Sequence, residues 1–192
     1  DVLSTSDLIN WDVEQFSFAT KGIGKQVDYT DQLLYAPDCI YHNGKYYLYY
    51  CLTNEKEDEG VAVSSSPYGP FKEGKAIAGI HGIDPSVFID DDGQAYLYWG
   101  NNGLWYVKLT RSMVDYNGEI TEIPLTEETV GGYEEKYKDE NGEEQTRLVG
   151  VDKYEEGPWV YKRREKYYLV YAAGGIPEHL SYSMSDSPTG PW

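Results

Sequence analysis

Three acidic residues of this chain stand beside prolines, each at the head of a short apolar run. They are Asp38 within residues 35–41, Asp84 within residues 82–88 and Glu156 within residues 155–161. Carboxyl groups that share one pocket can work as proton donors and acceptors, because burial and neighbouring charges shift their pKa values. The three acids are therefore the first candidates for chemistry.

A second strand rich in tyrosine follows each acid after a polar turn. These strands align on Tyr47, Tyr96 and Tyr168, and the acids precede those tyrosines by nine to twelve positions. Each repeat is thus expected to deliver one acid to nearly the same place in its own unit. Repeats of this kind are typical of β-propellers, in which equivalent strands converge on one axis. We expect Asp84 and Glu156 to face one central pocket.

The repeats divide the chain into blade-like units of about residues 32–71, 81–120 and 151–192. Residues 1–12 are interpreted as the end of a preceding blade, and residues 121–150 as a charged insertion. Within that insertion, Asn141-Gly142 predicts an exposed hairpin that overhangs the pocket mouth. No stretch has sustained helical spacing, so the predicted fold is all-β, with about three complete blades of a propeller.

The composition narrows the range of ligands. The net charge is −17, which disfavours nucleic acid, and no apolar run approaches the roughly 20 residues that span a bilayer. The chain has 20 tyrosines and five tryptophans. Most of the tyrosines suit half-buried strands, and the surplus suits stacking on a neutral ligand such as a sugar. We expect a carbohydrate ligand, no nucleic acid and no membrane.

The remaining candidate motifs predict structural roles. Cys39 and Cys51 flank a hairpin that turns at Asn43-Gly44, in a register that sets Cys39 opposite Leu48 and Cys51 opposite Ala36; both are expected to be reduced core thiols out of disulfide reach. Residues 90–93 are read as a hairpin turn, because a calcium-binding EF-hand loop would need Gly and Glu where Ala95 and Asn101 stand. The three histidines lack zinc-ligand spacing.

The motifs together resemble glycoside hydrolase family 43. The matching pieces are Ala36-Pro37-Asp38, then residues 83–88 with Asp91-Asp92-Gly93, then Glu156-Gly157-Pro158, and the resemblance covers essentially the whole chain. It implies a five-bladed β-propeller that hydrolyses arabinofuranosyl or xylosyl linkages of plant polysaccharides with inversion. Arabinofuranosidases, xylosidases and endo-arabinanases all fit these motifs, since loops shape the subsites.

The resemblance also implies roles for individual residues. Glu156 would be the general acid and Asp84 would tune its pKa and orient it. Asp38 would line the sugar pocket or serve as a structural hydrogen-bonding group. Tyr35 and Trp159 are candidates for stacking on a sugar, with a core role as the alternative, and His81 is a candidate for ligand contact near Asp84.

One catalytic group of the family has no counterpart in the sequence. The family's general base is an aspartate ahead of the stretch that appears here as residues 6–11, and no matching aspartate is present. We therefore expect a fragment that lacks the start of the first blade and the last blade, completed by the rest of its own chain or by a second copy. The residues imply no cofactor, while a complete propeller could hold a central calcium or other ion. A secreted or periplasmic location is expected rather than a cytoplasmic one.

Two other functions fit the same sequence features. A carbohydrate-binding propeller would keep the pocket without hydrolysis. A five-bladed glycosidase acting on fructans would instead use a carboxylate nucleophile and retain configuration. The sequence contexts of Asp84 and Glu156 favour family 43 over the second of these.

Overall fold

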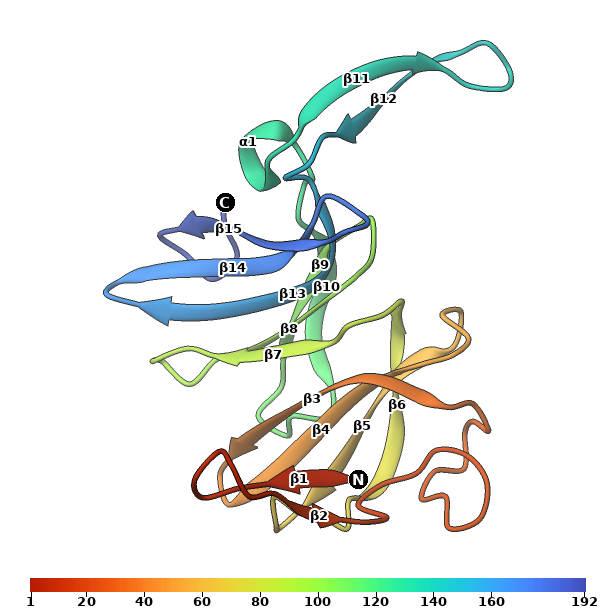
Figure 1. Cartoon of the computed structure of the whole chain (residues 1–192), viewed down its shortest axis with the longest axis vertical. Helices are drawn as coiled ribbons and strands as arrows, with labels where there is room; N and C mark the ends of the chain where they lie inside the picture. The colour runs from red at the N-terminus through yellow and green to blue at the C-terminus, as the bar shows by residue number, and fades with distance from the viewer.

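The computed structural model describes residues 1–192 and contains 15 strands and one short helix, α1 (Glu127–Val130). Three larger antiparallel sheets and two hairpins account for the strands (Figure 1). The predicted all-β class is therefore observed. No helix in the structure combines the length and the apolar character that crossing a membrane requires.

The first sheet contains, in chain order, β3 (Leu34–His42), β4 (Lys45–Leu52), β5 (Asp58–Ser64) and β6 (Lys72–His81). Asn43 and Gly44 turn between β3 and β4 with φ values of 47° and 81°, as their types predict. The sheet extends beyond the predicted boundary at residue 71, because β6 is its fourth strand. The Gly- and Ala-rich sequence of β6 has no strand-like alternation that would have indicated this.

The second sheet contains β7 (Ser86–Ile89), β8 (Ala95–Trp99), β9 (Trp105–Leu109) and β10 (Tyr116–Glu122). Residues 90–93 form the hairpin turn between β7 and β8, in which the Gly93 N–H donates to the Asp90 carbonyl at 2.9 Å. The third sheet contains β13 (Tyr154–Arg163), β14 (Lys166–Ala173) and β15 (His179–Ser185).

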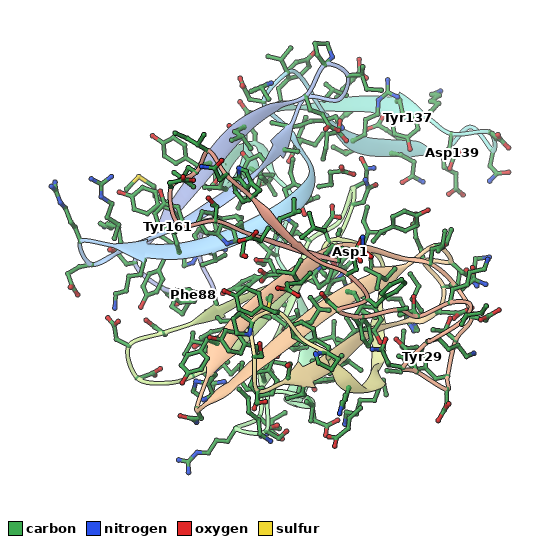
Figure 2. All side chains as sticks on the ribbon, turned by 60° about the horizontal axis from the view of Figure 1, so that its bottom comes forward. Asp1, Tyr29, Phe88, Tyr137, Asp139 and Tyr161 are labelled. Atoms are coloured by element: carbon green, nitrogen blue, oxygen red, sulfur yellow. The ribbon has the colours of Figure 1, made fainter.

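Two hairpins lie outside the three sheets. One pairs β1 (Val2–Ser4) with β2 (Asp12–Glu14), and the other pairs β11 (Tyr133–Lys138) with β12 (Glu144–Val149). The second turns around Asn141-Gly142, as expected, but it projects away from the sheets instead of overhanging the pocket, and none of its residues lines the pocket described below (Figure 1). Figure 2 shows its residues Tyr137 and Asp139 standing clear of the body of the molecule.

The sheets pack face to face through apolar side chains. The core between the first and second sheets includes Tyr49, Val61, Leu97 and Trp99. The core between the second and third includes Tyr98, Val160, Leu169 and Tyr171. All five residues of β8 are buried, since both faces of the second sheet are covered. Figure 2 shows Phe88 of the second sheet and Tyr161 of the third on the same side of the molecule.

Buried tyrosine hydroxyls tie the sheets together. Tyr49 donates to the Met113 carbonyl at 2.6 Å, Tyr154 to the Gly100 carbonyl at 2.6 Å and Tyr171 to the Val130 carbonyl at 2.9 Å. The first two bonds join neighbouring sheets, and the third joins the third sheet to α1. Tyrosine here supplies both apolar area and a partner for a buried carbonyl.

The two cysteines are both free thiols. Cys39 lies opposite Leu48 as predicted, but Cys51 lies opposite Tyr35 instead of Ala36, because the register shifts between Tyr35 and Asp38. Cys51 is buried, whereas Cys39 is exposed, so the prediction of two core thiols is wrong for Cys39.

Candidate active site

The innermost strands of the three sheets, β3, β7 and β13, lie beside one another and begin with the same backbone feature (Figure 1). The residue before proline has a positive φ in each: Ala36 at 39°, Asp84 at 62° and Gly157 at 64°. Prolines 37, 85 and 158 therefore follow equivalent left-handed turns. For Asp84 this backbone is strained, as is common at functional sites.

The aligned tyrosines prove to be equivalent. Tyr47, Tyr96 and Tyr168 pair with Ile40, Phe88 and Tyr161, and each of those partners lies three residues after its proline. The predicted repeat of two paired strands is present in all three sheets.

The acids, by contrast, are not equivalent in the repeat. Relative to its proline, Glu156 lies two residues before, Asp84 one before and Asp38 one after. The expectation of one acid at the same place in each unit is therefore wrong. The acids still lie close to one site, because the register of β3 and β13 shifts at these positions and the three inner strands lie side by side.

An open pocket of about 300 Å³ lies where the three turns meet. Its lining consists of Ala36, Pro37, Asp38, Asp84, Pro85, Ser86, Gly157, Pro158 and Trp159. Each inner strand contributes three consecutive residues centred on its proline. The structure thus brings together Asp38, Asp84 and Trp159, with Glu156 directly before the lining residue Gly157.

Asp84 is fixed to the neighbouring sheet. Its Oδ2 accepts a hydrogen bond from the Gly157 N–H at 3.0 Å. Burial and then the charge of Glu156 raise the pKa of Asp84, while the bond from Gly157 opposes that rise. Asp84 and Glu156 are therefore electrostatically coupled although they come from different sheets.

Glu156 lies half-buried in an irregular part of β13, where the register shifts on both sides of it. Its Oε2 accepts a hydrogen bond from the Asn101 side-chain amide at 2.7 Å. Asn101 comes from the loop after β8 and was not predicted as a site residue. The only signal for it in the sequence is its place after the second strand of a repeat, which does not distinguish it from its neighbour Asn102.

Tyr154 is a second residue that sequence reasoning missed. It is buried close to both acids, and its pKa is raised first by burial and then by the charges of Asp84 and Glu156. Its hydroxyl donates to the Gly100 carbonyl, next to Asn101. Tyr154 therefore holds the loop that carries the amide partner of Glu156.

Asp38 takes both of the roles considered for it, since it lines the pocket and is hydrogen-bonded. Its Oδ2 accepts from the Val87 N–H at 2.7 Å and its Oδ1 from the Cys39 N–H at 2.9 Å. Burial raises the pKa of Asp38, and the two backbone bonds oppose that rise. Asp38 thereby links β3 to β7.

The aromatic and histidine candidates lie in different surroundings. Trp159 is 54% exposed and forms one side of the pocket. Tyr35 is half-exposed, does not line the pocket and pairs in the sheet with Cys51. His81 faces a separate cavity beside Trp99 and Trp105, and its Nδ1 lies 3.2 Å from Asp58 Oδ1. No group of three or more His, Cys, Asp or Glu side chains is arranged to hold a metal ion.

The arrangement suits acid chemistry. Two neighbouring carboxyl groups repel each other when both are charged, and the charge of Glu156 contributes to the raised pKa of Asp84. An exposed indole beside them offers a flat apolar surface for a ring-shaped ligand.

Blade-like sheets that converge on an acidic pocket define the class as a β-propeller with its site on the central axis. The family model for glycosyl hydrolases family 43 matches residues 1–192, and the chain belongs to this family. The predicted fold class, part of a five-bladed propeller, is confirmed by its relatives of known structure.

Three relatives illustrate the similarity. A protein named xylosidase/arabinosidase from Bacteroides ovatus is 31% identical over 100% of this chain and 63% of its own length. A β-xylosidase from Xylanibacter ruminicola is 32% identical over 90% of this chain and 60% of its own. A solved family 43 β-xylosidase/α-arabinofuranosidase from a compost metagenome, in complex with xylotriose, is 29% identical with a TM-score of 0.68, covering 88% of this chain and 57% of that one. The chain thus spans about 60% of the length of the curated relatives it matches.

Proposed function

We propose that this chain forms the acid-bearing part of a glycoside hydrolase that cleaves xylosyl or arabinofuranosyl linkages with inversion. The observation that carries the proposal is the coupling of Asp84 to Glu156 across two sheets, with Asp84 bonded to the amide that follows Glu156. The named activities of the relatives in family 43 support the choice of sugars.

In this proposal Glu156 is the general acid. The amide of Asn101 holds Oε2, which leaves Oε1 to carry the proton towards the oxygen of the leaving group. A general acid donates its proton as the bond to the leaving group breaks, and Glu156 is assigned this role by its place beside the pocket and Asp84. Asp84 is the modulator, and its bond to Gly157 fixes its distance from Glu156.

The pocket residues that remain would bind the sugar. Trp159 offers the exposed face of its indole, and Asp38 shapes the opposite wall. Inversion needs a general base roughly 6.5–9.5 Å from the acid, so that a water molecule fits between them. Asp38 is unsuited to that task because both of its oxygens already accept backbone hydrogen bonds, and we assign the base to a carboxylate other than these three acids.

The test compares two leaving groups on aryl xylosides and aryl arabinofuranosides. With a poor leaving group such as phenol, Glu156→Gln is expected to lower kcat/KM by about 100- to 10,000-fold, the usual contribution of a general acid. With a dinitrophenyl leaving group, which departs without protonation, the loss should be much smaller. Glu155→Gln is the matched control, since Glu155 is adjacent but pairs with Lys153.

Two outcomes would contradict the proposal. Equal losses with both leaving groups would remove Glu156 from the acid role. A wild-type protein that binds these sugars without cleaving them would instead be a carbohydrate-binding propeller. The configuration of the first product, followed by NMR, separates inversion from the retention expected of a fructan-type enzyme.

A further inference from the structure

Glu59 is a buried acid that none of the roles described above uses. It lies in β5 and is 1% exposed, and neither of its side-chain oxygens has a hydrogen-bond partner. Burying an unpaired carboxylate is costly, so such a group needs a reason to be retained. It belongs to none of the three proline motifs and does not line the pocket.

The sheet register shows where the side chain of Glu59 points. Tyr50 of β4 pairs with Gly60 of β5, so the next residue, Cys51, stands opposite Glu59. Residues 51 and 59 share a face with Tyr49 and Val61, which belong to the core between the first and second sheets. Glu59 therefore points from the first sheet towards the second, at the end of that core.

Asp84 lies at the same end of the core. Asp58, the residue before Glu59, pairs in the sheet with His81, which lies three residues before Asp84, and the negative charge of Asp84 contributes to the raised pKa of Glu59. Asp84 is in turn coupled to Glu156. The three acids thus form a series, with Glu59 in the interior, Asp84 in the middle and Glu156 at the pocket.

The surroundings of Glu59 favour its neutral form. Burial and then the charge of Asp84 raise its pKa well above the ordinary value. The adjacent thiol of Cys51 is also neutral, because burial raises its pKa to about 11. On the other face of the sheet, burial raises the pKa of Tyr29 to about 12, and its hydroxyl donates to that of Tyr50. The nearby His81 on β6 is engaged with Asp58. A neutral carboxyl group carries one O–H donor, and Asp84 is the negatively charged acceptor beside it.

We propose that Glu59 is a positioning residue that donates its O–H hydrogen bond to the carboxylate of Asp84 through one buried water, and so keeps the negative charge on Asp84. This inference rests on the proposed function, in which Asp84 is the modulator of Glu156. No proton moves between Glu59 and Asp84 during the reaction. The cost of burying Glu59 is thereby explained by the state it imposes on the acid pair.

Two variants of similar size separate this role from simple packing. Glu59→Gln keeps a neutral side chain with an N–H donor, whereas Glu59→Leu fills the space without a donor. The Gln variant should keep kcat/KM within about threefold of wild type and an unchanged acidic limb of the pH profile. In the Leu variant kcat/KM should fall about tenfold or more, the usual effect of losing a hydrogen bond to a charged group. The acidic limb of its pH profile should move to higher pH, because Asp84 becomes harder to ionise.

A second readout is independent of activity. The carboxyl carbon of Asp84, identified by its loss in Asp84→Asn, is titrated by NMR in the wild type and both variants. The proposal predicts a higher midpoint for Asp84 in Glu59→Leu than in Glu59→Gln. Equal midpoints and equal pH profiles in the two variants would overturn it. If the wild type hydrolyses no glycoside, the proposed function fails, while the NMR titration still decides whether Glu59 acts on Asp84.

Discussion

The carboxylate of Asp84 accepts a hydrogen bond from the backbone N–H of Gly157, so an acid of the second sheet is anchored to the first turn of the third. Asp38 makes the matching bond from the first sheet to the Val87 N–H of the second. Each acid thus holds the inner strand of the next sheet. The same bonds that shape the candidate site also join the sheets.

The bond made by Asp84 leads to a prediction about activity. Asp84→Asn keeps an acceptor for the Gly157 N–H but removes the charge that acts on Glu156. We expect kcat/KM on a phenyl glycoside to fall by about 100-fold or more, within the range of acid–base contributions. The unfolding midpoint should change little. Asp115→Asn is the control, because Asp115 is an exposed acid that pairs with Lys75; comparable activity in the two variants would contradict the role of Asp84.

The bond made by Asp38 leads to a prediction about stability. Asp38→Ala leaves the partly buried Val87 N–H without its acceptor, and the free energy of unfolding should drop by about 1 to 3 kcal/mol. Asp38→Asn keeps a side-chain oxygen that can accept this bond, so its free energy of unfolding should drop less. Urea titration measures both variants, and an Asp38→Ala protein as stable as wild type would show that the link between β3 and β7 contributes nothing.

The acids with raised pKa values make stability depend on pH. Glu59 binds its proton more tightly in the folded chain than in the unfolded one. The stability that this proton contributes is present at low pH, and it is lost as the pH rises above the pKa of Glu59 in the unfolded chain towards its pKa in the folded chain. Glu59→Gln should therefore be more stable than wild type at pH 8 and nearly equal at pH 4. A fully linked group contributes about 1.4 kcal/mol per pH unit. Unfolding curves of both proteins at several pH values test this. A difference in unfolding free energy that stays constant with pH would mean that Glu59 does not titrate with folding.

The tyrosine hydroxyls that join the sheets predict a further loss of stability. Tyr49→Phe leaves the Met113 carbonyl without its donor in the core between the first two sheets, at an expected cost of about 1 to 3 kcal/mol. Tyr41→Phe is the matched control, because Tyr41 is exposed. Equal unfolding midpoints for the two variants would remove the hydroxyl of Tyr49 from the interactions that hold the sheets together.

The exposed indole of Trp159 predicts an effect on binding. Trp159→Ala should raise KM for an aryl glycoside by about tenfold with little change in kcat, as expected when a stacking surface is lost in ground and transition state alike. Trp159→Phe keeps a smaller ring, and its KM should lie between those of wild type and Trp159→Ala. A drop in kcat at constant KM would instead place Trp159 in the chemical step.

Part of this structure could be predicted from the sequence because it depends on local chemistry. Asn43-Gly44 and Asn141-Gly142 mark hairpin turns by their backbone preferences, and the tyrosine strands mark the second strand of each repeat. Other features depend on backbone geometry or on contacts between sheets. The acids stand at different positions relative to the prolines that mark equivalent places in the three sheets, and neither Asn101 nor the buried Glu59 belongs to any motif. The sequence did not predict β6 as the fourth strand of the first sheet, because a segment rich in Gly and Ala has no alternating pattern of apolar and polar residues.

The hydrogen bonds of Asp38 and Asp84 have a consequence for the order in which this protein matures. Neither acid has its backbone partner in the neighbouring sheet until that sheet has docked, and Glu156 reaches Asn101 only across the boundary between the second and third sheets. A nascent chain with correctly formed but separate hairpins would contain every acid of the site and none of its geometry. Formation of the pocket would therefore report the docking of these three sheets, and a probe that binds it would be a sensor for that docking.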